Sequence, residues 1–204
     1  MIDPSTLDTI ADGLAETGFV VVENFLLPGE IDDILKLDEF NNISLHFSKA
    51  GIGKTSHKQL NETIRGDYIR WIDHRLAEGP LAAYVRNIRQ LVGFVNQSLF
   101  LSLKDFEIHL TAYPAGAFYK RHLDQFKKDD HRKLSVICYL NTNWTAEQGG
   151  ALRVYLPERT VDILPEAGRL VCFRSDLIEH EVLPATRERL SITGWLLDQL
   201  TDVC

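Results

Sequence analysis

The chain has 204 residues, of which 45% are hydrophobic and 25% are charged, and its formal net charge is −7 at pH 7. A chain of this size can bury one sizeable core, so we expect a single domain over residues 1–204 that acts as a monomer. The acidic balance disfavours a nucleic-acid-binding protein, which needs a basic surface to displace counterions from phosphates. We see no signal-peptide pattern and no apolar run long enough to cross a bilayer, so we expect a cytoplasmic protein without a membrane partner.

The first 104 residues carry mostly helical patterns. Apolar positions recur at helical spacing over residues 5–16, 28–37 and 81–99, and they predict three amphipathic helices that support a sheet. The β-branched run at 20–22 predicts a strand. Residues 41–61 are polar and contain two glycines, which favours a loop over a core element.

After residue 104 the pattern changes to short apolar runs separated by turns rich in Gly, Pro and Asn. We expect strands at 106–113, 119–123, 134–140, 151–156, 161–164, 170–173 and 189–197. This succession predicts a mainly β fold with flanking helices. Its core is a double-stranded β-helix, or jelly roll, over residues 105–199, with the N-terminal helices packed on one sheet.

Three polar residues near the ends of predicted strands have the chemistry of a metal site. His122 and Asp124 stand two positions apart, so on an extended strand both side chains leave the same face. His180 follows far downstream. Two imidazoles and one carboxylate can occupy one face of an iron(II) octahedron and leave three positions open. An isolated His-x-Asp pair is weak evidence, because a polar strand end produces the same pattern by chance.

Arg189 strengthens this prediction because it offers a second kind of recognition. A guanidinium binds a carboxylate through two parallel, charge-assisted hydrogen bonds, which a lysine cannot reproduce. A dicarboxylate 2-oxo acid held at the metal needs such a cation at its far end. Apolar and polar residues alternate after Arg189, so Thr193 shares its strand face and is placed to add a hydroxyl. The alternative is an ordinary surface arginine on an edge strand.

Several further segments carry a resemblance that covers nearly the whole chain. They lie at 18–26, 64–72, 113–114, 121–124, 138–141, 149–153, 173–176, 180–182 and 189–195. In this order they resemble the 2-oxoglutarate- and iron(II)-dependent prolyl hydroxylases, in particular the Egl-nine or hypoxia-sensing branch and its bacterial relatives.

The resemblance implies roles at the matching positions. His122, Asp124 and His180 would bind iron. Arg189 would bind the distal carboxylate of 2-oxoglutarate, and Tyr139 would donate its phenol proton to the same group. Tyr113 and Thr193 match positions that line the cosubstrate pocket. Tyr139 has a plainer interpretation as a core residue of its strand.

Four more residues match positions toward the protein substrate in the resembled family. Arg65, Asp67 and Arg132 would contact or frame the substrate, and Trp195 would flank the site as an aromatic wall. An ion pair between Arg65 and Asp67 around a glycine turn, and a Trp195 that packs in the core, are the alternatives. The resemblance further implies that the polar loop before Arg65 closes over substrate, whereas an exposed loop is equally compatible with its sequence.

The implied activity is hydroxylation of C4 of a prolyl residue in a protein, with iron(II), 2-oxoglutarate, O2 and ascorbate as cofactors and cosubstrates. A translation factor such as elongation factor Tu is our candidate target. Three rival functions stay open. They are an oxygenase acting on a free amino acid or small molecule, a zinc-dependent hydrolase built on the same ligands, and a catalytically silent binding module.

Overall fold

The computed structural model describes residues 1–51, 63–125 and 130–201. The helices are α1 (Pro4–Glu16), α2 (Pro28–Leu35), α3 (Asp38–Asn41), α4 (Ile43–His46) and α5 (Pro80–Leu99). The strands of the N-terminal half are β1 (Phe19–Val22), β2 (Ser48–Lys49) and β3 (Tyr68–Ile72). The remaining strands are β4 (Asp105–Tyr113), β5 (Tyr119–His122), β6 (Arg132–Tyr139), β7 (Leu152–Tyr155), β8 (Thr160–Ile163), β9 (Leu170–Arg174), β10 (Glu179–Val182) and β11 (Arg189–Leu197).

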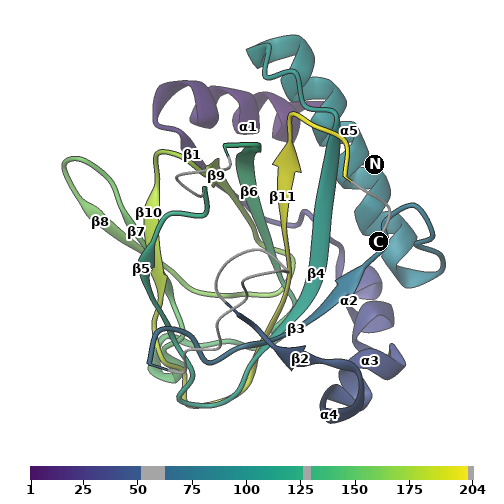
Figure 1. The fold of residues 1–204 in the computed structure, drawn as a ribbon, viewed down its shortest axis with the longest axis vertical. Helices are drawn as coiled ribbons and strands as arrows, with labels where there is room; N and C mark the ends of the chain where they lie inside the picture. Colours follow the sequence, from purple (N-terminus) through teal and green to yellow (C-terminus); the bar gives the residue numbers. More distant parts are fainter. Residues whose placement is uncertain (52–62, 126–129, 202–204) are drawn as a thin grey trace.

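The strands form two antiparallel sheets that face each other (Figure 1). The larger sheet has the order β1-β9-β6-β11-β4-β3-β2, and the smaller one has the order β5-β10-β7-β8. Two packed sheets bury the inward-facing residues of both, which is the layer arrangement of a jelly roll. The predicted fold class is therefore confirmed, and β1, β2 and β3 extend the larger sheet at its two edges.

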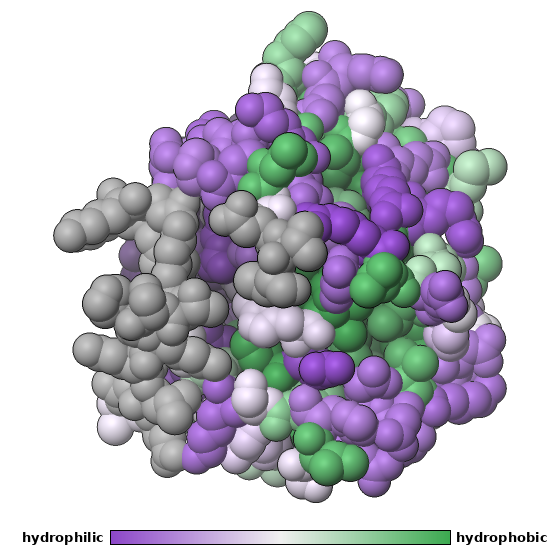
Figure 2. All heavy atoms as spheres, turned by 45° about the vertical axis from the view of Figure 1, so that its right-hand side comes forward, coloured by the Kyte–Doolittle hydropathy of each residue, from purple (hydrophilic) through white to green (hydrophobic). Residues whose placement is uncertain are grey.

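Two apolar cores fix the position of the larger sheet. On its outer face, α1 and α5 pack their apolar stripes against strand residues such as Ile108 and Ile192 (Figure 1). The helical periodicity of residues 81–99 predicted this, and Ile88 and Leu91 in that stripe have no exposed surface. On its inner face, a second core fills the space between the sheets. Figure 2 shows a largely hydrophilic face on which hydrophobic residues gather near the centre.

The alternation along β11 decides which side chains face the second sheet. Leu190 and Ile192 belong to the core beneath the helices, so Arg189 and Thr193 project toward the inner side. In the antiparallel pairing, Arg189 lies opposite Tyr113 and Thr193 lies opposite His109 on β4. The sheet thus carries a row of polar side chains into the space between the layers.

The structure differs from the sequence-based expectations in the first half of the chain. Residues 41–51 contain α4 and the short strand β2, where we predicted only loop. Residues 52–62, which include the second half of the loop expected to close over substrate, lie outside the described residues. His74 is buried and stacks on Phe106, and its Nε2 lies 2.9 Å from the Asp105 carboxylate.

Cys138 and Cys172 are free thiols without exposed surface, because both lie in apolar strands of the larger sheet. No helix within the described ranges is both long and apolar enough to span a bilayer.

Candidate active site

Three side chains converge in the smaller sheet, at the end of β5. His122 ends β5 and is paired with His180 on the neighbouring strand β10. Asp124 follows two residues after His122 and lies close to both imidazoles, with its two oxygens 3.4 Å from His122 Nε2 and 3.7 Å from His180 Nε2. One ligand atom from each residue lies within 4.8 Å of the others. The strand pairing therefore brings together residues that are distant in sequence.

Hydrogen bonds orient all three groups toward a common point. The Nδ1 atom of His122 lies 2.7 Å from the Lys120 carbonyl, and that of His180 lies 3.2 Å from the Ile178 carbonyl, so each Nε2 stays available. Ser135 Oγ donates to Asp124 Oδ2 at 2.7 Å. Such hydrogen bonds hold a metal-binding side chain in the orientation that the ion requires.

The ionisation states also suit a metal ion. Burial lowers the pKa of His180 to about 4, which keeps its imidazole neutral. Burial opposes the charged form of Asp124, but the neighbouring His180 and His122 and the Ser135 hydroxyl hold the pKa of this carboxyl below its usual range. Neutral imidazoles and an ionised carboxylate bind divalent metals. This donor set fits iron(II) with an open face, and zinc is also compatible with it.

Arg189 is the feature that separates these two interpretations. Its side chain is buried, its Nη2 donates to Tyr139 Oη at 3.2 Å, and its Nε has no hydrogen-bond partner. Its guanidinium carbon lies 5.0 Å from the ring centre of Tyr113 and 4.9 Å from that of Tyr139. Among the described residues no carboxylate pairs with it. A buried cation without a counter-charge is costly, so the site is built to receive an anion.

The distal carboxylate of 2-oxoglutarate suits the Arg189 guanidinium in charge and in hydrogen bonding. Because Tyr139 Oη accepts from Arg189, its own proton stays free to donate to the same carboxylate. Tyr113 and Thr193 line the cavity of about 120 Å³ that also contains Arg189 and the three candidate ligands. The structure thus brings together every residue assigned from the sequence to metal or cosubstrate, and their individual roles remain proposals.

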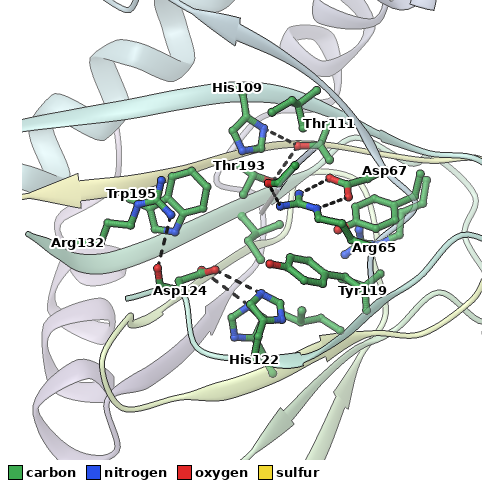
Figure 3. Close-up of a pocket in the computed structure, with 18 of the residues that line it drawn as sticks. Arg65, Asp67, His109, Thr111, Tyr119, His122, Asp124, Arg132, Thr193 and Trp195 are labelled. Atoms are coloured by element: carbon green, nitrogen blue, oxygen red, sulfur yellow. Dashed lines mark hydrogen bonds and ion pairs between the residues drawn. The ribbon is translucent and has the colours of Figure 1, made fainter. Parts of the chain in front are cut away.

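The residues assigned to substrate line the same cavity but are paired with neighbours. Arg65 binds the buried Asp67 through two hydrogen bonds of 2.7 and 2.6 Å, which is the ion pair considered above. Arg132 binds Glu107 at 2.7 Å and lies 3.5 Å from the ring centre of Trp195. Figure 3 shows Tyr119 between Arg65 and His122, with Arg132 beside Trp195 on the other side.

Sequence reasoning missed four residues that shape the site. Tyr119 stacks on His122 with ring centres 3.6 Å apart, and Ser135 holds Asp124. His109 and Thr111 line the cavity from β4, although His109 in its apolar strand looks like a core residue in the sequence. Alternation along β4 places these two side chains on the face of Tyr113, which is the one sequence signal that would have found them.

Comparisons with known proteins agree with this geometry. Residues 108–197 match the model of the 2OG-Fe(II) oxygenase superfamily. The chain is 40% identical to a Pseudomonas putida prolyl-4-hydroxylase of known structure, with a TM-score of 0.85 over 95% of this chain and 100% of that one. The chain belongs to the prolyl hydroxylase family of these oxygenases. Members of the superfamily use iron(II), 2-oxoglutarate and O2, and this enzyme does so too.

Animal prolyl hydroxylases are similar across most of the chain. The mouse "Prolyl hydroxylase EGLN3" is 30% identical over 97% of this chain and 85% of its own length. The Caenorhabditis elegans "Hypoxia-inducible factor prolyl hydroxylase" is 36% identical over 91% of this chain, which spans only 27% of that protein. A Trichoplax adhaerens prolyl hydroxylase, solved with a peptide of hypoxia-inducible factor, gives a TM-score of 0.85 at 28% identity over 95% of this chain and 90% of that one.

Proposed function

We propose that this enzyme hydroxylates C4 of a prolyl residue within a protein, and that elongation factor Tu is a candidate substrate. The observation that carries the oxygenase assignment is the buried Arg189, which has no counter-charge and shares one cavity with His122, Asp124 and His180. A zinc-dependent hydrolase built on the same metal ligands would not need this arginine. Bound iron with 2-oxoglutarate and O2 supplies the oxidative chemistry, which converts 2-oxoglutarate to succinate and carbon dioxide.

The chain's own residues bind and orient the reactants. Arg189 and Tyr139 hold one end of 2-oxoglutarate, so its 2-oxo acid end points toward the three candidate metal ligands. Fixed donors of this kind reduce the entropy cost of reaching the reactive geometry. The rings of Tyr113 and Tyr139, both buried, keep water away from the arginine. Ser135 and Tyr119 hold Asp124 and His122 in place.

A protein substrate is supported by exposed apolar residues that line the cavity and by the relatives. Trp71 and Leu123 both line the cavity and are 46% and 41% exposed, so its rim offers apolar surface at the protein exterior. The Trichoplax relative was solved with a peptide bound. We assign Arg65, Asp67, Arg132 and Trp195 to the rim that frames such a segment. Ascorbate would act as an accessory reductant.

We further propose that the enzyme works as a monomer in the cytoplasm. The buried, unpaired thiols of Cys138 and Cys172 are compatible with a reducing compartment. Light scattering of the purified protein and fractionation of cells carrying a tagged chain would test these two points. A dimer at micromolar concentration, or a tagged chain in the periplasm, would contradict them.

The test of function is anaerobic reconstitution with iron(II) and 2-oxoglutarate, followed by exposure to air with a lysate from cells that lack the gene. Mass spectrometry should find one added oxygen on a proline, and purified elongation factor Tu forms a separate arm. His180→Ala should abolish the product, whereas His131→Ala is a matched control because His131 pairs with Asp198 and does not line the cavity. Oxidation of free proline alone would favour a small-molecule oxygenase, and 2-oxoglutarate-independent hydrolysis with zinc would favour the hydrolase.

A further inference from the structure

A string of hydroxyl groups connects β4 to β11 along the wall of the cavity. The Nδ1 atom of His109 lies 2.9 Å from Thr111 Oγ1, and Thr111 Oγ1 donates to Thr193 Oγ1 at 3.2 Å. Ser191 Oγ lies 3.2 Å from the same Thr193 oxygen. Figure 3 shows His109, Thr111 and Thr193 linked in this order above the candidate metal ligands. The pairing of Thr193 with His109 and of Ser191 with Thr111 puts all four on one face.

The direction of these hydrogen bonds fixes the tautomer of His109. A threonine hydroxyl has a single proton, and that of Thr111 is used toward Thr193. Thr111 can therefore only accept from His109, which places the ring proton on Nδ1 and leaves Nε2 with a free lone pair. Burial lowers the pKa of His109 to about 3, with Arg65 and Arg132 acting in the same direction against Asp67, so the ring stays neutral.

The free Nε2 belongs to a residue that lines the cavity. The imidazole lies between two indoles, with ring centres 4.9 Å from Trp71 and 5.4 Å from Trp195. Within the described ranges no side chain hydrogen-bonds to Nε2, and the ring's further hydrogen bond, with the backbone of Leu110, needs a ring N–H, which this tautomer carries on Nδ1. Trp71 lines the cavity and is 46% exposed, so this part of the wall is near the mouth, where a peptide segment would enter under the proposed function.

We propose that His109 is a specificity-determining residue whose Nε2 accepts a hydrogen bond from a backbone N–H of the protein substrate, and that Thr111 and Thr193 position it by fixing its tautomer. The inference rests on the proposed function. Proline has no N–H of its own, so the donor nearest to its ring is the N–H of the next residue, attached to the proline carbonyl. Two flanking indoles exclude water and strengthen such a bond.

The test measures which ring nitrogen of His109 carries the proton. Two-bond ¹H–¹⁵N correlation spectra distinguish the two neutral tautomers, and the signals of His109 are those that His109→Gln removes. The protein is loaded with zinc as a diamagnetic metal together with 2-oxoglutarate. We expect a protonated Nδ1 in the wild type, a mixture of tautomers in Thr111→Val, and the wild-type spectrum in Thr111→Ser. A wild-type ring protonated at Nε2, or an unchanged tautomer in Thr111→Val, would overturn the proposal.

Two small probes then test the acceptor. N-acetylproline methylamide has the N–H that follows proline, and N-acetylproline dimethylamide lacks it. The methylamide should shift the Nε2 signal to lower frequency, and the dimethylamide should not. His109→Met should weaken binding of the methylamide by about tenfold and leave binding of the dimethylamide unchanged. His109→Gln, which keeps an acceptor, should recover most of this loss. An Nε2 signal that does not shift when the methylamide is added refutes the proposal. This result does not depend on whether any protein is hydroxylated.

Discussion

Replacing Arg189 by methionine should separate stability from cosubstrate binding. Methionine has a similar length and no charge, so it removes a buried cation that no described carboxylate neutralises. The lost hydrogen bond to Tyr139 costs about 1 kcal/mol, while removal of an unpaired buried charge returns a similar or larger amount. We therefore expect the ligand-free variant to be as stable as the wild type, or more stable by up to about 2 kcal/mol.

The same substitution should nearly abolish binding of 2-oxoglutarate. Two charge-assisted hydrogen bonds contribute about 1.5 to 3 kcal/mol each. Their loss corresponds to roughly two to four orders of magnitude in Kd. Urea unfolding of the zinc-loaded protein, with and without 2-oxoglutarate, measures both quantities, because a ligand at a hundred times its Kd stabilises by about 2.7 kcal/mol.

Arg187→Met is the matched control, since Arg187 lies over Trp144 and donates to the Thr142 carbonyl, outside the cavity. It should keep the full stabilisation by 2-oxoglutarate. Our assignment of Arg189 would be refuted if Arg189→Met still bound the cosubstrate with wild-type affinity. A ligand-free variant less stable by 3 kcal/mol or more would equally refute the argument that the cation is unpaired.

Three further predictions concern other parts of the structure. Ser135→Ala removes the hydrogen bond to Asp124 and should weaken metal binding about 10- to 100-fold, as measured by competition with a chelating dye. Gly194→Ala would place a Cβ 2.4 Å from the Glu107 carbonyl oxygen, so urea unfolding should show a loss of about 2 to 4 kcal/mol, and an unchanged midpoint would contradict the register. Asp105 has its pKa lowered to about 2: burial opposes this, but hydrogen bonds from Thr201 prevail. Its stabilising effect is complete above about pH 4 and disappears toward pH 2, so Asp105→Asn should flatten the acid limb of stability in that window.

Much of the site followed from local pattern. The His122-x-Asp124 spacing and the alternation after Arg189 depend only on strand geometry, so both could be predicted without the fold. The strand β10 was not predicted around His180, because its four residues include two glutamates and only one strongly apolar side chain. Its pairing between β5 and β7 compensates for the weak intrinsic preference.

The site residues that could not be predicted from the sequence are held by contacts between distant strands. Ser135 meets Asp124, and Thr111 meets Thr193, through pairings between distant segments. A sequence pattern places a residue on a face but does not say which residue of another strand lies opposite. For the same reason the pairing of Arg65 with Asp67, which are neighbours in sequence, could be anticipated, whereas the stacking of Tyr119 on His122 was not.

The position of β11 has a consequence for biosynthesis. This strand lies in the middle of the larger sheet, bonded to β6 and β4 on either side, yet it follows all the other labelled strands along the chain. During translation the other six strands of this sheet must therefore wait for residues 189–197 before the sheet can close. Arg189 and the row of hydroxyls arrive with the same segment. A ribosome-bound nascent chain that stops before β11 should bind no cosubstrate, so loading of the enzyme is a late, post-translational event.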